Sequence, residues 1–175
     1  MIYICIMKVN RFLRTIIILL LLTLNIGCDQ VSKSIVRHKL DYYDRVEFLH
    51  RHITLVRVEN SGAFLSVGDS LSKPSKFILL NLLPLIVVIV GLVFIFVRTN
   101  LDRVILFGLI LTIGGGIGNL YDRVVHGSVT DFMHINFGLF QTGIFNVADL
   151  SITTGVLILL IQAYFKRKTE TGVIS

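Results

Sequence analysis

Two aspartates in the second half of the chain have the chemistry for acid–base catalysis. Asp131 lies in the segment Ser128-Val-Thr-Asp-Phe-Met133, and Asp149 follows Val147-Ala148. If folding brings both carboxyl groups into a low-dielectric pocket, they cannot both ionise cheaply and share one proton. The ionised member can then activate a water molecule while the protonated member polarises a carbonyl group. Such a pair would hydrolyse a peptide bond without a metal ion or a cofactor.

Each aspartate also has a structural interpretation. Asn146 or Asp149 could cap a helix by accepting hydrogen bonds from the free amide groups of its first turn. Asp131 could lie in a solvated loop, although both of its flanks are apolar or β-branched. A carboxylate near the hydrocarbon of a membrane is costly, by about 2.5–3.5 kcal/mol at the centre of a helix. The elements that position the two side chains decide between these alternatives.

The composition indicates a membrane protein. Of the 175 residues, 54% are hydrophobic and 16% are charged, and the mean hydropathy is +0.80. This is more apolar than the surface of a soluble domain tolerates. A helix crosses a bilayer with about 20 mostly apolar residues. Uncharged runs occupy residues 15–28, 77–97, 104–121 and 150–165.

From these runs we predict one membrane domain over residues 1–175. Its four spans lie at about 12–31, 77–97, 104–121 and 147–165, with extracytoplasmic loops at 32–76 and 122–146.

Two local patterns add detail to this outline. The segment Ile53-Thr-Leu-Val-Arg-Val58 is β-branched and partly alternating and precedes Asn60-Ser-Gly62, which predicts a strand followed by a turn. In the third span, Gly114 and Gly118 have the spacing of small residues that lets membrane helices approach closely. We therefore expect a strand in the first loop and tight helix packing around the third span.

Four crossings place most of the polar candidates on one side of the membrane. The end of the first span, the start of the second, the end of the third and the start of the fourth must share a face. That face holds Asp29, Lys33, Asn60, Asn119, Asp122, Arg123, Asp131, Asn146 and Asp149. The opposite face offers mostly lysine and arginine. We expect the shared face to carry the site and the other to act as an anchor.

The basic residues favour lipid rather than nucleic acid as a partner. The net charge is +6, but many of the cations flank the spans, where they suit anionic lipid headgroups. A raw count of lysines and arginines gives about as many on one side as on the other. Those beside the termini and residues 98–103 abut the spans in short segments, which favours cytoplasmic termini and an extracytoplasmic site.

The remaining polar residues have open roles. Arg123 could pair with Asp122 or with a lipid phosphate, or it could hold a loop or a substrate carbonyl near the dyad. Asn60, Asn119 and Asn146 could orient a carboxylate, satisfy a bound peptide backbone or cap a helix.

Other chemistries lack their sequence patterns. The histidines include no His-Glu-x-x-His pair, so no metal site is predicted. Ser61 lacks the Gly-x-Ser-x-Gly elbow of a serine hydrolase. The glycines at 114–118 lack the strand and the lysine of a nucleotide site.

Five segments, taken in order, resemble the motifs of lipoprotein signal peptidase, also called signal peptidase II. They are Asp29-Gln-Val-Ser-Lys33, Asn60-Ser-Gly-Ala-Phe64, Gly118-Asn-Leu-Tyr-Asp-Arg123, Val129-Thr-Asp-Phe132 and Phe145-Asn-Val-Ala-Asp149. Each segment alone is loose, but five in order around four spans are specific. Two departures occur, Glu59 before the second motif and Ala63-Phe64 within it.

The resemblance implies an α-helical membrane fold with four transmembrane helices and a small extracytoplasmic β-sheet cradle. It implies an aspartic endopeptidase of the bacterial inner membrane. The implied reaction removes the signal peptide from diacylglyceryl-modified prolipoproteins just before the lipidated cysteine, with no cofactor and with globomycin as an inhibitor. On this resemblance Asp131 and Asp149 are catalytic. The supporting residues are Asp29, Lys33, Asn60, Gly62, Asn119, Arg123 and Asn146.

Two other functions compete with this interpretation. The sequence Leu24-Asn-Ile-Gly-Cys28 after a basic leader looks like a lipobox, so the chain could itself be a lipoprotein, although three further spans argue against this. Membrane aspartates could also serve an ion or proton transporter, although transport sites tend to lie near the bilayer midplane. Translation could start at Met1 or at Met7.

Overall fold

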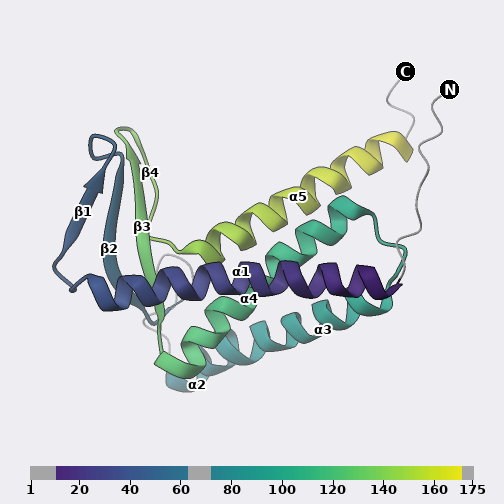
Figure 1. Cartoon of the computed structure of the whole chain (residues 1–175), viewed down its shortest axis with the longest axis horizontal. Coiled ribbons are helices and arrows are strands. Elements are labelled where there is room, and N and C mark those ends of the chain that lie inside the picture. Colours follow the sequence, from purple (N-terminus) through teal and green to yellow (C-terminus); the bar gives the residue numbers. More distant parts are fainter. Residues whose placement is uncertain (1–10, 63–71, 171–175) are drawn as a thin grey trace.

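Four long helices dominate the computed structural model, which describes residues 11–62 and 72–170 (Figure 1). The first is α1 (Arg11–Lys39), and the third and fourth are α4 (Arg103–His126) and α5 (Val147–Glu170). The second combines α2 (Lys73–Phe77), the π-helical turn η2 (Ile78–Leu82) and α3 (Leu83–Val97). All four are long and apolar enough to cross a membrane. The alternative start sites, Met1 and Met7, lie outside the described residues.

The helices extend beyond the spans predicted inside them. Residues 32–39 and 122–126, which we assigned to loops, continue α1 and α4. The last turn of α1 carries Arg37, His38 and Lys39, and cations stabilise the negative end of a helix dipole. Helix α4 ends at His126 and is capped by Gly127, whose left-handed φ of 79° suits glycine. A helix therefore ends where its capping residues allow, beyond the last apolar residue.

A four-stranded antiparallel sheet completes the fold. Its strands are β1 (Arg45–Phe48), β2 (Ile53–Asn60), β3 (Val129–Phe137) and β4 (Phe140–Gln141), in the order β1-β2-β3-β4. The strand predicted at residues 53–58 is confirmed and continues to Asn60. The segment 122–146, predicted as a loop between spans, contains β3 and β4, which the local pattern did not predict. The partner strand of β3 lies about 70 to 80 residues earlier in the chain, which local patterns do not reveal.

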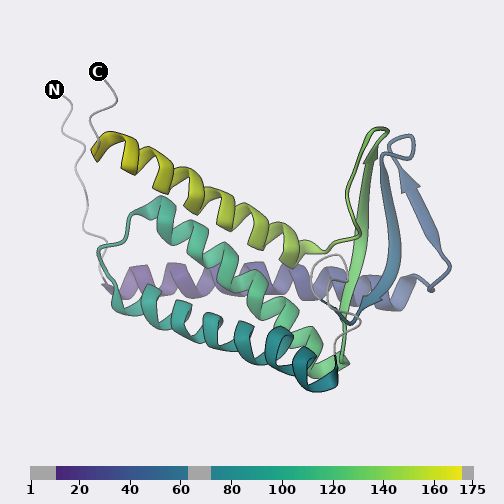
Figure 2. The ribbon, with the colours of Figure 1, turned by 180° about the vertical axis from the view of Figure 1, so that it is seen from behind.

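The sheet lies across one end of the helices (Figures 1 and 2). The end of α4 and the start of α5 lie beside it, whereas the first turn of α1, the α3–α4 connection and the last turn of α5 lie at the other end. The shared face predicted from four crossings is therefore a single end of the molecule, next to the sheet.

Glycines let α4 pack closely against its neighbours. A Cβ on Gly118 would lie 2.6 Å from Oδ2 of Asp29, and a Cβ on Gly114 would lie 2.5 Å from Nδ2 of Asn25. Both neighbours belong to α1, so the tight packing predicted around the third span is confirmed. On its other side α4 meets α5, where a Cβ on Gly115 would collide with the Ala148 carbonyl. These contacts bring Asp29 and the start of α5 to the same end of α4.

Candidate active site

Asp131 lies on β3, and its side chain is buried at 3% exposure. Its Oδ2 accepts a hydrogen bond of 2.9 Å from the side-chain amide of Asn60, at the end of β2. Its Oδ1 accepts one of 2.6 Å from the side-chain amide of Asn146, directly before α5. The alternative of a solvated loop is therefore wrong, because both carboxylate oxygens face buried amide donors.

Asp149 lies in the first turn of α5 and is held by two groups. Its Oδ1 accepts a 2.8 Å hydrogen bond from the side-chain amide of Asn119 on α4. Its Oδ2 accepts one of 3.2 Å from the backbone amide of Asn146, while Oδ1 of Asn146 accepts one of 2.9 Å from the backbone amide of Asp149. This reciprocal pair is a capping box. The capping interpretation is correct, and the same Asn146 side chain also contacts Asp131.

A buried lysine organises the groups behind the two aspartates. Nζ of Lys33 lies 2.8 Å from Oδ2 of Asp29 and 2.9 Å from Oδ2 of Asp122, and all three side chains are fully buried. It also donates a 2.9 Å hydrogen bond to Oδ1 of Asn119. Because that oxygen is directed at the lysine, the NH₂ group of Asn119 is turned toward Asp149. Asp29 also accepts the backbone amide of Ala148 at 2.9 Å, which anchors the first turn of α5.

Arg123 holds the segment that follows β2. One of its terminal nitrogens donates a 3.1 Å hydrogen bond to the Gly62 carbonyl, and the backbone amide of Gly62 donates one of 2.9 Å to Oδ1 of Asn60. Asp122 pairs with Lys33 and lies 3.5 Å from Arg37. Arg123 therefore has one of the roles considered for it, because its side chain holds the carbonyl group of a loop residue. All nine residues predicted for the site therefore lie in one connected network.

Asp122, Gln30 and Thr130 also belong to this network and were not predicted as site residues. Gln30 donates hydrogen bonds to Asp29 and Asp122, at 3.0 and 3.2 Å. The backbone amide of Thr130 lies 3.4 Å from Oδ2 of Asp122. The sequence left open a local ion pair of Asp122 with Arg123. The cations that Asp122 meets, Lys33 and Arg37, come from α1, and no spacing in the sequence reveals that contact.

The surroundings of Asp131 favour its protonated form. Burial raises the pKa of Asp131 to about 6, since a charge is poorly solvated there, and the nearby Asp149 carboxylate acts in the same direction. The hydrogen bonds from Asn60 and Asn146 oppose the shift but do not cancel it. The arrangement therefore offers one carboxyl group that can keep a proton close to a second carboxylate.

Known proteins share both the sequence and the fold. The lipoprotein signal peptidase of Francisella tularensis subspecies novicida is 30% identical over 149 residues, covering 85% of this chain and 92% of that protein. That of Streptococcus pneumoniae is 34% identical over 152 residues, covering 87% and 92%. A bacterial membrane enzyme structure determined by the in meso method at 2.3 Å resolution superposes with a TM-score of 0.73 at 28% identity, covering 88% of this chain and 90% of that one.

The four helices able to span a membrane and these relatives define a multi-pass membrane peptidase, which is a hydrolase. The chain belongs to the signal peptidase II family, whose sequence model matches residues 17–165. This match runs through the segment Leu24–Cys28, which lies inside α1. Family membership therefore argues against the lipoprotein and transporter alternatives.

Proposed function

We propose that the chain is an aspartic endopeptidase in which Asp131 and Asp149 are the catalytic pair. Asp131 holds the shared proton and donates it to the oxygen of the scissile carbonyl. Asp149 accepts a proton from a water molecule, whose oxygen attacks the carbonyl carbon. Asp149 then returns that proton to the nitrogen of the leaving amine as the C–N bond breaks, and Asp131 takes a proton back from a hydroxyl group of the intermediate as the carbonyl re-forms. The observation that carries this proposal is that buried amide groups link both carboxyl groups into one network.

The remaining predicted residues support this pair. Asn60, Asn119 and Asn146 orient the carboxylates, and the ion pair of Asp29 with Lys33 fixes Asn119 and the start of α5. Arg123 holds the Gly62 carbonyl at the edge of the site. No step in this mechanism needs a cofactor.

The proposed substrate is a diacylglyceryl-modified prolipoprotein, cut just before its lipidated cysteine. The name of the relatives supports this substrate. A substrate that is already confined to the membrane needs only a dyad at the end of the helices, where the hydrocarbon meets the headgroups. The proposed location is the bacterial inner membrane, with both termini cytoplasmic and the site extracytoplasmic. Globomycin-type compounds are the expected inhibitors.

Cleavage by the purified protein tests this function. A prolipoprotein should be offered with and without its diacylglyceryl group, and the products should be identified by mass spectrometry. We expect cleavage of the lipidated form alone, with the lipidated cysteine as the new N-terminus. Equal cleavage of both forms would contradict the proposed role of the lipid, and cleavage elsewhere would contradict the proposed cutting position.

A further inference from the structure

An open groove lined by both polar and apolar side chains leads from Asp131 across the sheet. It has a volume of about 660 Å³ and is lined by residues of all four strands, of the turn between β1 and β2, and of the segment before α5. Asn60 and Asp131 lie at its inner end, and Arg45, Glu47 and His134 lie further along it. The groove is therefore continuous with the proposed catalytic site, although most of its lining takes no part in the dyad network.

The strands are irregular beside this groove. The backbone amides of Phe132 and Met133 both donate to the Phe145 carbonyl, at 3.1 and 2.8 Å, so two residues of β3 lie opposite Phe145. In the pairing with β2 the extra residue lies on β2, because Leu55 pairs with Met133 and Val58 pairs with Asp131. Such bulges disrupt the ladder locally and bend the strand. Asp131 and His134 both line the groove despite their odd spacing. Nδ1 of His134 is buried and has no hydrogen-bond partner among the described residues.

The polarity of the groove decides which part of a substrate it can hold. A signal sequence has an apolar core, which requires the helices and the lipid. The polypeptide on the other side of the cleaved bond is the start of the mature protein, and its backbone needs hydrogen-bond partners. The groove begins at Asp131 and offers His134, Asn136 and Thr54 as such partners. Its chemistry therefore suits the mature side of the substrate.

The outer part of the groove carries an uncompensated positive charge. Arg51 pairs with Glu47 at 2.9 Å, whereas Arg45 forms no ion pair within residues 11–62 and 72–170. In the sheet register Arg45 lies opposite Val56, and Asp131 lies opposite Val58. Two strand spacings and two residues along a strand place Arg45 about 12 Å from Asp131. An extended peptide covers that distance in about three to four residues.

We propose that this groove binds the first residues of the mature lipoprotein, and that Arg45 makes the enzyme prefer acidic side chains at the third and fourth of them. The proposal rests on the proposed function, because it assumes that the peptide bond is cut at Asp131 and Asp149. It adds a specificity determinant that acts on substrate binding rather than on the chemical step.

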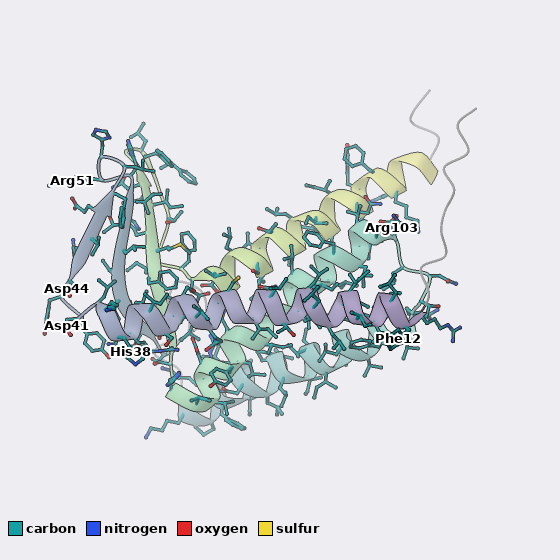
Figure 3. The ribbon with its side chains drawn as sticks, viewed as in Figure 1. Phe12, His38, Asp41, Asp44, Arg51 and Arg103 are labelled. Carbon is teal, nitrogen blue, oxygen red and sulfur yellow. The ribbon has the colours of Figure 1, made fainter. Side chains whose placement is uncertain are left out.

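Competing substrates test this preference. Diacylglyceryl lipopeptides should share one signal segment and carry Asp, Ser or Lys at the third and fourth mature positions, and a truncated version should end before these positions. The enzymes to compare are the wild type, Arg45→Glu, Arg45→Gln and the control Arg103→Glu. Figure 3 shows Arg103 at the end of the helices opposite the sheet. The quantity to measure is kcat/KM for each pair.

In the wild type we expect kcat/KM to fall from Asp to Ser to Lys, by about two- to fivefold per step, as is typical of a partly exposed charge pair. Arg45→Glu should reverse the order and Arg45→Gln should flatten it, while Arg103→Glu should leave it unchanged. The truncated substrate should be cut at the same rate by all four enzymes, which separates this proposal from failure of the dyad. An unchanged order in Arg45→Glu, with the truncated substrate still cut, would overturn the proposal. If Arg45→Glu fails to cut even the truncated substrate, the order of substrates is read from Arg45→Gln instead. A flattened order then supports the proposal, and an unchanged order overturns it.

Discussion

Within the part of the chain that the structure describes, side-chain amides rather than cations contact the two proposed catalytic carboxyl groups directly. Asn60 and Asn146 donate to Asp131, and Asn119 donates to Asp149. An amide donates a hydrogen bond to a carboxylate oxygen without bringing a positive charge. A positive charge beside the pair would favour the ionised form of both aspartates. The cation Lys33 reaches Asp149 only through Asn119. This separation lets one aspartate keep its proton.

The protonation of Asp131 should therefore be visible near neutral pH. Its pKa in the folded protein is about 6, above the ordinary value of 3.8. Because the folded state binds this proton more tightly, the stability it contributes is complete below the ordinary value and is lost as pH rises through about 6. In infrared spectra, we expect a protonated-carboxyl band that disappears near pH 6 and is absent from Asp131→Asn. A band that disappears near pH 4 in the wild type would contradict this prediction.

Lys33 should be essential for stability because it neutralises two buried carboxylates. Its side chain is fully buried with those of Asp29 and Asp122. Replacing it in Lys33→Met leaves both acids without their shared cation, which typically costs about 3–5 kcal/mol. Thermal unfolding in detergent should show a clear loss of stability. The matched control is Lys39→Met, on the same helix but exposed, and equal stability of the two variants would refute this role.

At the scale of elements, the contact between α4 and α5 sets the distance between Asn119 and Asp149. Gly155 on α5 has no room for a side chain, since a Cβ there would lie 2.5 Å from the Gly108 carbonyl and would also collide with Thr112. Gly155→Ala should push the two helices apart, with a cost of about 1–3 kcal/mol. Unfolding and peptidase assays should show that stability and activity fall together.

Gly27→Ala is the control for this prediction, because nothing lies within 4 Å of a Cβ at Gly27. Alanine is also the better helix former, so that variant should keep its stability and activity. A Gly155→Ala protein that matches Gly27→Ala in both measurements would show that the close contact of α4 with α5 is not required.

The sequence predicted the helices well because the backbone of a segment that crosses a bilayer must form its hydrogen bonds within that segment. Long apolar runs must form helices in a bilayer, so the runs ending at Val97 and Tyr121 located two spans directly. The strand at residues 53–58 was predictable from its β-branched alternation. Strand β3 was not, because its bulge and its interrupted alternation hide the pattern, and its pairing with β2 is long-range. The sequence therefore predicted Asp131 as a site residue but not the strand that carries it.

The residues predicted for the site lie together in the structure, while several of their partners were not predicted. Counting the crossings placed Asp29, Asn60 and Asp149 on one face without any knowledge of their contacts. The partners of Asp122 depend on how α1 packs against α4, so they could be found only in three dimensions. Arg45 and His134 lie in a groove created by the sheet itself, which no short motif reveals.

For the whole molecule, the proposed orientation places the sheet outside the cytoplasm. In a variant without native cysteines, Tyr43→Cys and Asn100→Cys would place single thiols beside the sheet and at the α3–α4 connection, where both native side chains are exposed. A membrane-impermeant maleimide should label Tyr43→Cys in intact spheroplasts and Asn100→Cys only after permeabilisation. The reverse pattern would place the site in the cytoplasm and contradict the proposed orientation.

The most direct test of the account is the rate at which purified Asp131→Asn and Asp149→Asn cut a diacylglyceryl-modified prolipoprotein. Each substitution preserves shape but removes a group that carries or accepts a proton, so we predict that either one lowers kcat by at least about 100-fold, the lower end of a typical general acid–base contribution. Thermal unfolding should confirm that both variants remain folded. Cleavage at the wild-type rate by either variant would contradict the catalytic pair.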